Sequence, residues 1–209
     1  MNTNCEAIFG LQCFWGSEVK FGIIQGVIGT SVGYTGGSTP DPTYKNLKDH
    51  IEVVKVVFDP KLVTYEELLS VFWSSHDPTF VTKRQYMSAI FYNNSQQRLL
   101  IQESLEAQQR QLSEPIVTQI LPFNVYYLAE DYHQKYFLRK HQSLLLEIGL
   151  TNSEVVLSPV AARLNAYCAG FGSTLQLDNE LKRFGLHLSP HNHQLIQHLI
   201  NSGPNLGEC

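Results

Sequence analysis

Residues 7–16 read AIFGLQCFWG, and this stretch decides the fold of the amino-terminal half. The apolar run over residues 7–11 predicts a short buried strand. Residues 17–21 (SEVKF) space their apolar side chains as an amphipathic helix does. Cys13 therefore lies where a predicted strand ends and a predicted helix begins.

A cysteine at the start of a helix is suited to chemistry. Unpaired backbone N–H groups and the positive end of the helix dipole favour an anion there, and the thiolate is the nucleophilic form of cysteine. The alternative is that Cys13 is a small buried apolar residue, as most cysteines are. Phe14 and Trp15 follow directly and cannot both be buried easily, so they could line a cleft for a small apolar group. These neighbours favour a reactive cysteine.

The remaining pattern alternates strands and helices. Further strands are predicted over residues 26–37, 51–58, 88–92 and 116–122. Helices are predicted over residues 64–76, 93–113 and 131–141, and Glu67 stands at capping-box spacing from Thr64. The many glycines of residues 26–37 indicate a backbone that approaches another segment closely. This order predicts an α+β fold, and we expect a two-layer sandwich of the ferredoxin-like plait type with a mixed, mainly antiparallel sheet.

The length of 209 residues suits one medium domain with a large core. From about residue 145 the pattern is that of a helical extension, which ends in a polar tail over residues 202–209. We expect residues 1–144 to form the domain that carries the site, and residues 145–209 to pack on it.

Composition excludes several functional classes. A net charge of −4 and a pI near 6.0 give no reason to expect nucleic acid or an anionic membrane as partner. No run approaches the ~18 apolar residues of a membrane span, and the first residues lack the layout of a signal peptide. The four cysteines (Cys5, Cys13, Cys168 and Cys209) are too scattered for a secreted disulfide framework. We therefore expect a cytoplasmic protein.

The CFWG segment after a strand resembles the signature of the A-type peptide methionine sulfoxide reductases. Other segments agree in order: residues 33–37 (GYTGG), 42–44 (PTY), 50–54 (HIEVV), 72–78 (FWSSHDP), 85–90 (QYMSAI) and 129–134 (AEDYHQ). The resemblance covers roughly residues 7–140. It implies thiol-dependent reduction of methionine-S-sulfoxide, in peptides and as the free amino acid, by a monomer without cofactor or metal. The implied partners are oxidised proteins or peptides and a thioredoxin-type reductant.

The resemblance also assigns roles within the site. Cys13 attacks the substrate sulfur, and Glu52 donates a proton to the departing oxygen. By its spacing alone Glu52 would be the solvent-facing member of a strand; the resemblance makes it the acid, whose pKa burial should raise. Tyr44 and Tyr86 match phenols that hydrogen-bond the sulfoxide oxygen. In the same way, Phe14 and Trp15 are expected to hold the S-methyl group.

The sulfenic acid left on Cys13 requires a second thiol. Cys168 is the first candidate, because the glycines after it permit movement. Cys209 on the tail is the second, and Cys5 is interpreted as a spare cysteine.

The pattern departs from the family in several places. Gln12 stands where the signature has glycine, and Met87 where arginine is usual. Residues 46–49 are a shortened loop, and residues 79–84 replace a longer loop whose carboxylate supports the sulfoxide-binding tyrosine. These departures keep a second interpretation open, a non-catalytic relative that binds methionine-containing segments. A third, a peroxide-reducing thiol enzyme, leaves Glu52 without a purpose.

Histidines near the end of the chain could suggest a metal site: His187, His191, His193 and His198. Their spacing fits no standard site, and a solvated helix with loop histidines is the preferred interpretation. Asp131 and His133 could help to order the wall of the site, but no chemistry is assigned to them.

Overall fold

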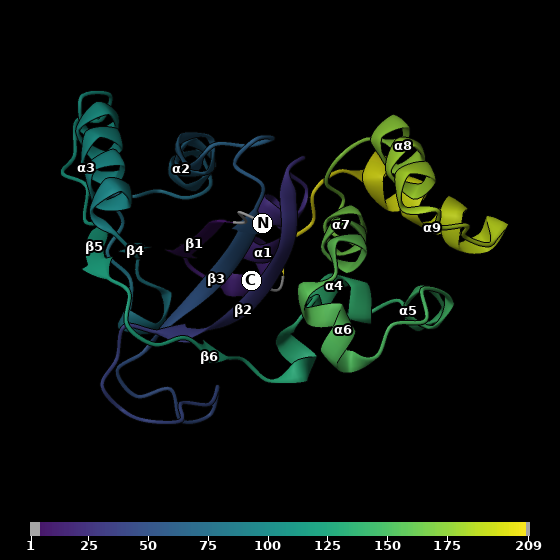
Figure 1. The fold of residues 1–209 in the computed structure, drawn as a ribbon, viewed down its shortest axis with the longest axis horizontal. Coiled ribbons are helices and arrows are strands. Elements are labelled where there is room, and N and C mark those ends of the chain that lie inside the picture. The colour runs from purple at the N-terminus through teal and green to yellow at the C-terminus, as the bar shows by residue number, and fades with distance from the viewer. Residues whose placement is uncertain (1–4, 208–209) are drawn as a thin grey trace.

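The computed structural model describes residues 5–207. Along the chain the elements are β1 (Cys5–Gly10), α1 (Phe14–Gly22), β2 (Val27–Thr35), β3 (Ile51–Phe58), α2 (Tyr65–Ser74), η1 (Arg84–Tyr86), β4 (Ala89–Tyr92), α3 (Ser95–Gln109), β5 (Gln119–Pro122), β6 (Tyr127–Leu128), η2 (Asp131–His133), α4 (Tyr136–Arg139), α5 (Gln142–Glu147), α6 (Asn152–Leu157), α7 (Pro159–Cys168), α8 (Thr174–Phe184) and α9 (Pro190–Ser202). β1, β2 and β3 lie at the centre of the molecule, and α4 to α9 gather on the far side of β2 from α3 and β5 (Figure 1).

Within the described residues, six strands form one sheet in the order β5-β4-β1-β3-β2-β6. β4 and β5 pair in parallel, and the other neighbours pair antiparallel. The prediction of an α+β fold with a mixed, mainly antiparallel sheet is confirmed. The narrower description as a ferredoxin-like plait stays a prediction.

The main core fills one face of this sheet. Phe9 of β1 stacks on Phe21 of α1, with ring centroids 4.9 Å apart, and also contacts Phe72 of α2. Burial against the sheet therefore fixes the direction of α1, and with it the position of Cys13. α2 begins with the predicted capping box, in which the Thr64 side chain accepts a hydrogen bond from the Glu67 backbone N–H.

The glycine-rich strand β2 lies against other backbone, as its composition predicts. A Cβ atom on Gly29 would lie 2.6 Å from the carbonyl oxygen of Leu157, and one on Gly33 would overlap the carbonyl oxygen of Tyr127. Larger residues at these two positions would push α6 and β6 off the strand.

The helices after β6 form a second core that joins the first through α1. Val19 of α1 belongs to this core together with Leu138, Leu164 and Ile196. Lys135 connects the same parts: its ammonium lies 2.7 Å from Glu18 of α1 and also donates to the carbonyl oxygens of Thr30 and Val156. The division of the chain at residue 144 stays a prediction.

The predicted helix over residues 131–141 is wrong as a continuous element. Residues 131–133 form the short turn η2, and α4 begins only at Tyr136. Lys135 between them has a left-handed backbone (φ 56°), which interrupts a helix. Within residues 5–207, no helix combines the length and the apolar character needed to cross a membrane.

Candidate active site

Cys13 is the N-cap residue of α1, directly before the first helical residue. Its backbone is extended (φ −62°, ψ 125°), and its carbonyl oxygen accepts hydrogen bonds from the backbone N–H and the hydroxyl of Ser17. The side chain is half-buried. The thiol thus lies at the positive end of a nine-residue helix, a position that favours the thiolate.

Glu52 lies in the middle strand β3 and is 1 % exposed. One carboxyl oxygen accepts the backbone N–H of Phe14 at 3.2 Å, and the other accepts the side-chain amide of Gln85 at 2.6 Å. Burial raises the pKa of Glu52 to about 7, although both hydrogen bonds and the charge of Lys83 lower it. A carboxyl that is partly protonated at neutral pH therefore lies next to the first turn of the helix that Cys13 begins.

Two phenols complete the polar side of the site. Tyr86 and Tyr44 share a side-chain hydrogen bond, and the charges of Glu52 and Cys13 act on Tyr86. Burial raises the pKa of Tyr86, so its hydroxyl keeps its proton and can donate. Tyr44 is 40 % exposed, and its backbone N–H is held by Glu130 at 3.0 Å. The structure thus brings Cys13, Glu52, Tyr44 and Tyr86 together.

The two aromatic residues after the cysteine differ in their environment. Phe14 is buried, with its ring centroid 5.0 Å from the His133 ring. Trp15 is half-buried, stacks on Tyr136 at 3.6 Å and donates from Nε1 to Nδ1 of His133 at 3.1 Å. His133 therefore fixes the orientation of the Trp15 ring.

Sequence reasoning missed two side chains that hold this arrangement. Gln85 donates to Glu52, and Glu130 holds both the Tyr44 backbone and the Tyr34 hydroxyl, the latter at 2.7 Å. Both residues lie in segments that carry the resemblance, but neither is predicted as a site residue from the sequence.

A pocket of about 310 Å³ opens beside the thiol, and Cys13, Tyr86, Thr82 and Leu206 are among the residues that line it. Gln12 also lines it and has a left-handed backbone, with φ 66°. Glycine, the residue that the resemblance leads us to expect at this position, adopts this conformation without strain.

The two candidate resolving cysteines differ in how they are placed along the chain and in the fold. Cys168 ends α7 in the second core, where it is 6 % exposed and burial raises the pKa of its thiol. Cys209 lies outside the described residues, but Leu206 reaches the pocket beside Cys13. The chain after α9 is fixed by a hydrogen bond from the Asn205 N–H to the carbonyl oxygen of Ala169, 3.0 Å long.

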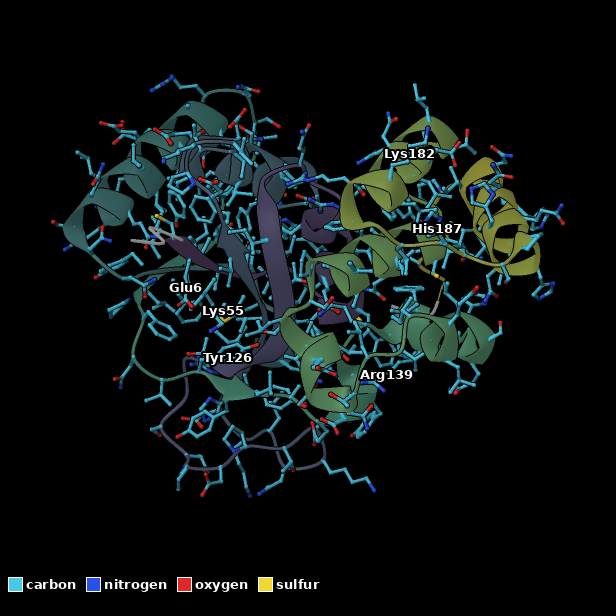
Figure 2. The ribbon with its side chains drawn as sticks, turned by 45° about the vertical axis from the view of Figure 1, so that its right-hand side comes forward. Glu6, Lys55, Tyr126, Arg139, Lys182 and His187 are labelled. Carbon is cyan, nitrogen blue, oxygen red and sulfur yellow. The ribbon has the colours of Figure 1, made fainter. Side chains whose placement is uncertain are left out.

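The late histidines lie on or near α8 and α9, and Figure 2 labels His187 there. His193 lies 2.7 Å from Asp178. Over residues 5–207, no three side chains of the metal-binding types come together as ligands.

The fold and the site define an α+β protein with a thiol at the start of a helix, beside a buried carboxyl and two phenols. The family model described as peptide methionine sulfoxide reductase matches residues 5–157. The chain belongs to this family of oxidoreductases.

Individual relatives agree with this assignment. The peptide methionine sulfoxide reductase of Drosophila melanogaster is 41% identical over 187 residues, which cover 88% of this chain and 76% of the relative. The A5 protein of Oryza sativa subsp. japonica is 47% identical over 171 residues, or 78% of this chain and 67% of the relative. Among solved structures, methionine sulfoxide reductase A of Corynebacterium diphtheriae matches with a TM-score of 0.59 and 34% identity, covering 68% of this chain and 77% of its own.

Proposed function

We propose that the chain reduces the S epimer of methionine sulfoxide, in peptides and as the free amino acid, with Cys13 as the nucleophile. The observation that carries this proposal is the hydrogen bond from the Phe14 N–H to Glu52. It holds a carboxyl with a pKa of about 7 beside the first turn of the helix that begins at the thiol. The proton donor is thereby held close to the nucleophile and is partly protonated at neutral pH.

The chemistry follows from these positions. The Cys13 thiolate attacks the sulfoxide sulfur while Glu52 gives its proton to the sulfoxide oxygen, and Tyr44 and Tyr86 donate hydrogen bonds to that oxygen. The oxygen then passes to the cysteine sulfur, so that methionine leaves and Cys13 becomes a sulfenic acid. Phe14 and Trp15 would receive the S-methyl group, a role that the fixed orientation of the Trp15 ring supports.

The sulfenic acid would condense with a second thiol to give a disulfide and water. Cys168 and Cys209 remain the candidates, and the burial of Cys168 favours Cys209. Three residues span roughly 10 Å when extended, so the position of Leu206 on the Cys13 pocket supports delivery of the Cys209 thiol. A thioredoxin-type dithiol would then reduce the disulfide.

The wider setting belongs to the same proposal. A monomer that acts in the cytoplasm on oxidised proteins and peptides suits a chain whose chemistry depends on free thiols, because such compartments keep thiols reduced. The order β1-α1-β2-β3-α2-β4 with antiparallel pairing supports the ferredoxin-like plait as the description of the central fold.

One assay tests the function. The protein is incubated with each separated epimer of a protected methionine sulfoxide and dithiothreitol, and methionine is quantified. We expect loss of the S epimer alone, and no conversion by a Cys13→Ser variant. No conversion by the native chain would instead indicate the non-catalytic relative, and peroxide consumption alone the thiol peroxidase. The buried, raised-pKa carboxyl beside Cys13 supports neither of these alternatives.

A further inference from the structure

Lys83 lies over the ring of Tyr86. Its Nζ atom is 4.6 Å from the ring centroid, a distance at which an ammonium is attracted to the face of a phenol. Lys83 is the residue before η1 and Tyr86 is the last residue of that turn, joined by a hydrogen bond from the Tyr86 N–H to the Lys83 carbonyl oxygen. Side chains three residues apart in such a turn lie one above the other, so the backbone itself sets this contact.

The turn is held in place from its other side by Arg84. The Arg84 guanidinium donates to the carbonyl oxygens of Asp49 and Gly36, the latter at 2.8 Å. These two residues flank the loop that carries Tyr44. Arg84 therefore fixes the turn relative to that loop, and Lys83 fixes the Tyr86 ring relative to the turn.

The hydroxyl end of Tyr86 points to the reacting groups. It shares its hydrogen bond with Tyr44 and lies within the electrostatic reach of Glu52 and Cys13. A cation over the ring withdraws electron density from the phenol and makes its O–H a stronger donor. It also limits rotation of the ring away from Cys13.

We propose that Lys83 is a positioning residue of this site: its ammonium holds the Tyr86 ring toward Cys13 and strengthens the hydrogen bond from the phenol to the sulfoxide oxygen. The inference rests on the proposed function, because it assumes that Tyr86 donates to a sulfoxide. Lys83 itself is exposed and need not touch the substrate.

The same charge acts on the proton donor. Lys83 lowers the pKa of Glu52, which also accepts hydrogen bonds from Gln85 and from the Phe14 N–H. The phenols of Tyr34 and Tyr86 also face Glu52. Removal of the Lys83 charge would raise the pKa of Glu52. Because the acid must be protonated, the alkaline limb of the rate profile would then move to higher pH.

The test compares Lys83→Gln, which keeps polarity without charge, with Lys83→Arg, which keeps the cation. The matched control is Lys55→Gln, which removes another lysine over a tyrosine ring. Lys55 lies 5.1 Å from the Tyr126 ring centroid and 3.3 Å from Glu6 (Figure 2). Single-turnover methionine formation from the S epimer is measured for each variant across pH 6–9, so that recycling of the thiol does not enter.

We expect Lys83→Gln to lower the rate at pH 6, where Glu52 is already mostly protonated, roughly two- to fivefold, the range of an exposed cation–π contact. Its alkaline limb should lie at higher pH, Lys83→Arg should restore both quantities, and Lys55→Gln should match the native chain. A Lys83→Gln profile identical to the native one would overturn the inference. So would a lower rate with an unmoved limb and no rescue by arginine, since that pattern indicates general loosening. An inactive native chain would overturn the proposed function as well. This outcome is distinguishable from the two above, because in both of them the native chain is active.

Discussion

Glu52 combines two demands that oppose each other. Burial makes the charged form costly and so raises the pKa of the carboxyl, whereas the hydrogen bonds from Gln85 and the Phe14 N–H favour the charged form and lower the pKa. Its pKa in the folded chain, about 7, lies above the ordinary value of 4.5. The folded state therefore binds the proton more tightly between these values, and stability falls as pH rises through this window and stays lower above it.

Glu52→Gln should therefore separate stability from activity. The amide removes the cost of the buried charge, so at pH 8 we expect the free energy of unfolding to rise by roughly 1–3 kcal/mol, measured in urea. Single-turnover methionine formation should fall by at least about 10²-fold, because the acid is lost. Full activity at pH 7 would show that Glu52 is not the donor. Glu6→Gln, on the exposed end of β1, serves as the control for a lost carboxylate.

Gln12 is a second residue whose substitution should stabilise the fold. Its left-handed backbone (φ 66°) strains any residue with a side chain. We expect Gln12→Gly to stabilise the fold by about 1 kcal/mol in urea unfolding. Gln102→Gly, in the exposed interior of α3, should lower stability by a similar amount, because helix glycine is unfavourable. Equal signs for the two variants would contradict the role of strain at position 12.

At the level of elements, the segment after α9 packs closely on the backbone at Gly170. Gly170 has φ 83°, and a Cβ atom there would overlap the Gly203 carbonyl oxygen. Gly170→Ala should therefore displace the segment that leads to Leu206. We expect a loss of stability of more than about 1 kcal/mol and slower multiple turnover with thioredoxin, while single turnover is kept.

Gly149→Ala is the matched control for that prediction. Gly149 has a similar positive φ of 65°, but nothing lies within 4 Å of an added Cβ atom. It should lose stability without losing recycling. A parallel loss of recycling in both variants would mean that strain alone, and not the displaced segment, slows the reaction.

The elements also show what could be predicted from the sequence. The strand at residues 51–58 and the capping box at Thr64 depend on local patterns, and both are found as predicted. The continuous helix over residues 131–141 was wrong because Lys135 takes a left-handed backbone and contacts Glu18, 117 positions away. No local pattern contains that contact.

Prediction of the site has the same limit, because contacts between residues far apart in the sequence leave no local pattern. The position of Cys13 follows from the junction of a strand and a helix, which adjacent residues define. The burial of Glu52 does not follow from alternation, because β3 lies between β1 and β2 and is covered on both faces. Gln85, which donates a hydrogen bond to Glu52, lies in η1, and this turn comes close to Glu52 only in the folded chain.

For the whole molecule, the Lys135–Glu18 pair connects the sheet to the helices beyond it. Both side chains are fully buried, and the Lys135 ammonium also binds carbonyl oxygens of β2 and α6. Lys135→Met should lower the free energy of unfolding by roughly 3–5 kcal/mol, because the Glu18 carboxylate would remain buried without its partner. Adding Glu18→Gln should recover part of that loss in urea unfolding. No recovery would mean that the backbone contacts, and not the charge pair, carry the stability.

The two tryptophans of this chain lie in separate cores, and this has a spectroscopic consequence. Trp73 lies in the main core and donates to Ser104, while Trp15 stacks on Tyr136 beside the thiol. In a Trp73→Phe protein, the remaining indole would report on occupation of the S-methyl site that we propose at Phe14 and Trp15. Its fluorescence should change on addition of methionine sulfoxide to a Cys13→Ser background and stay constant with methionine-free peptides. Substrate binding could then be measured by tryptophan fluorescence without any turnover.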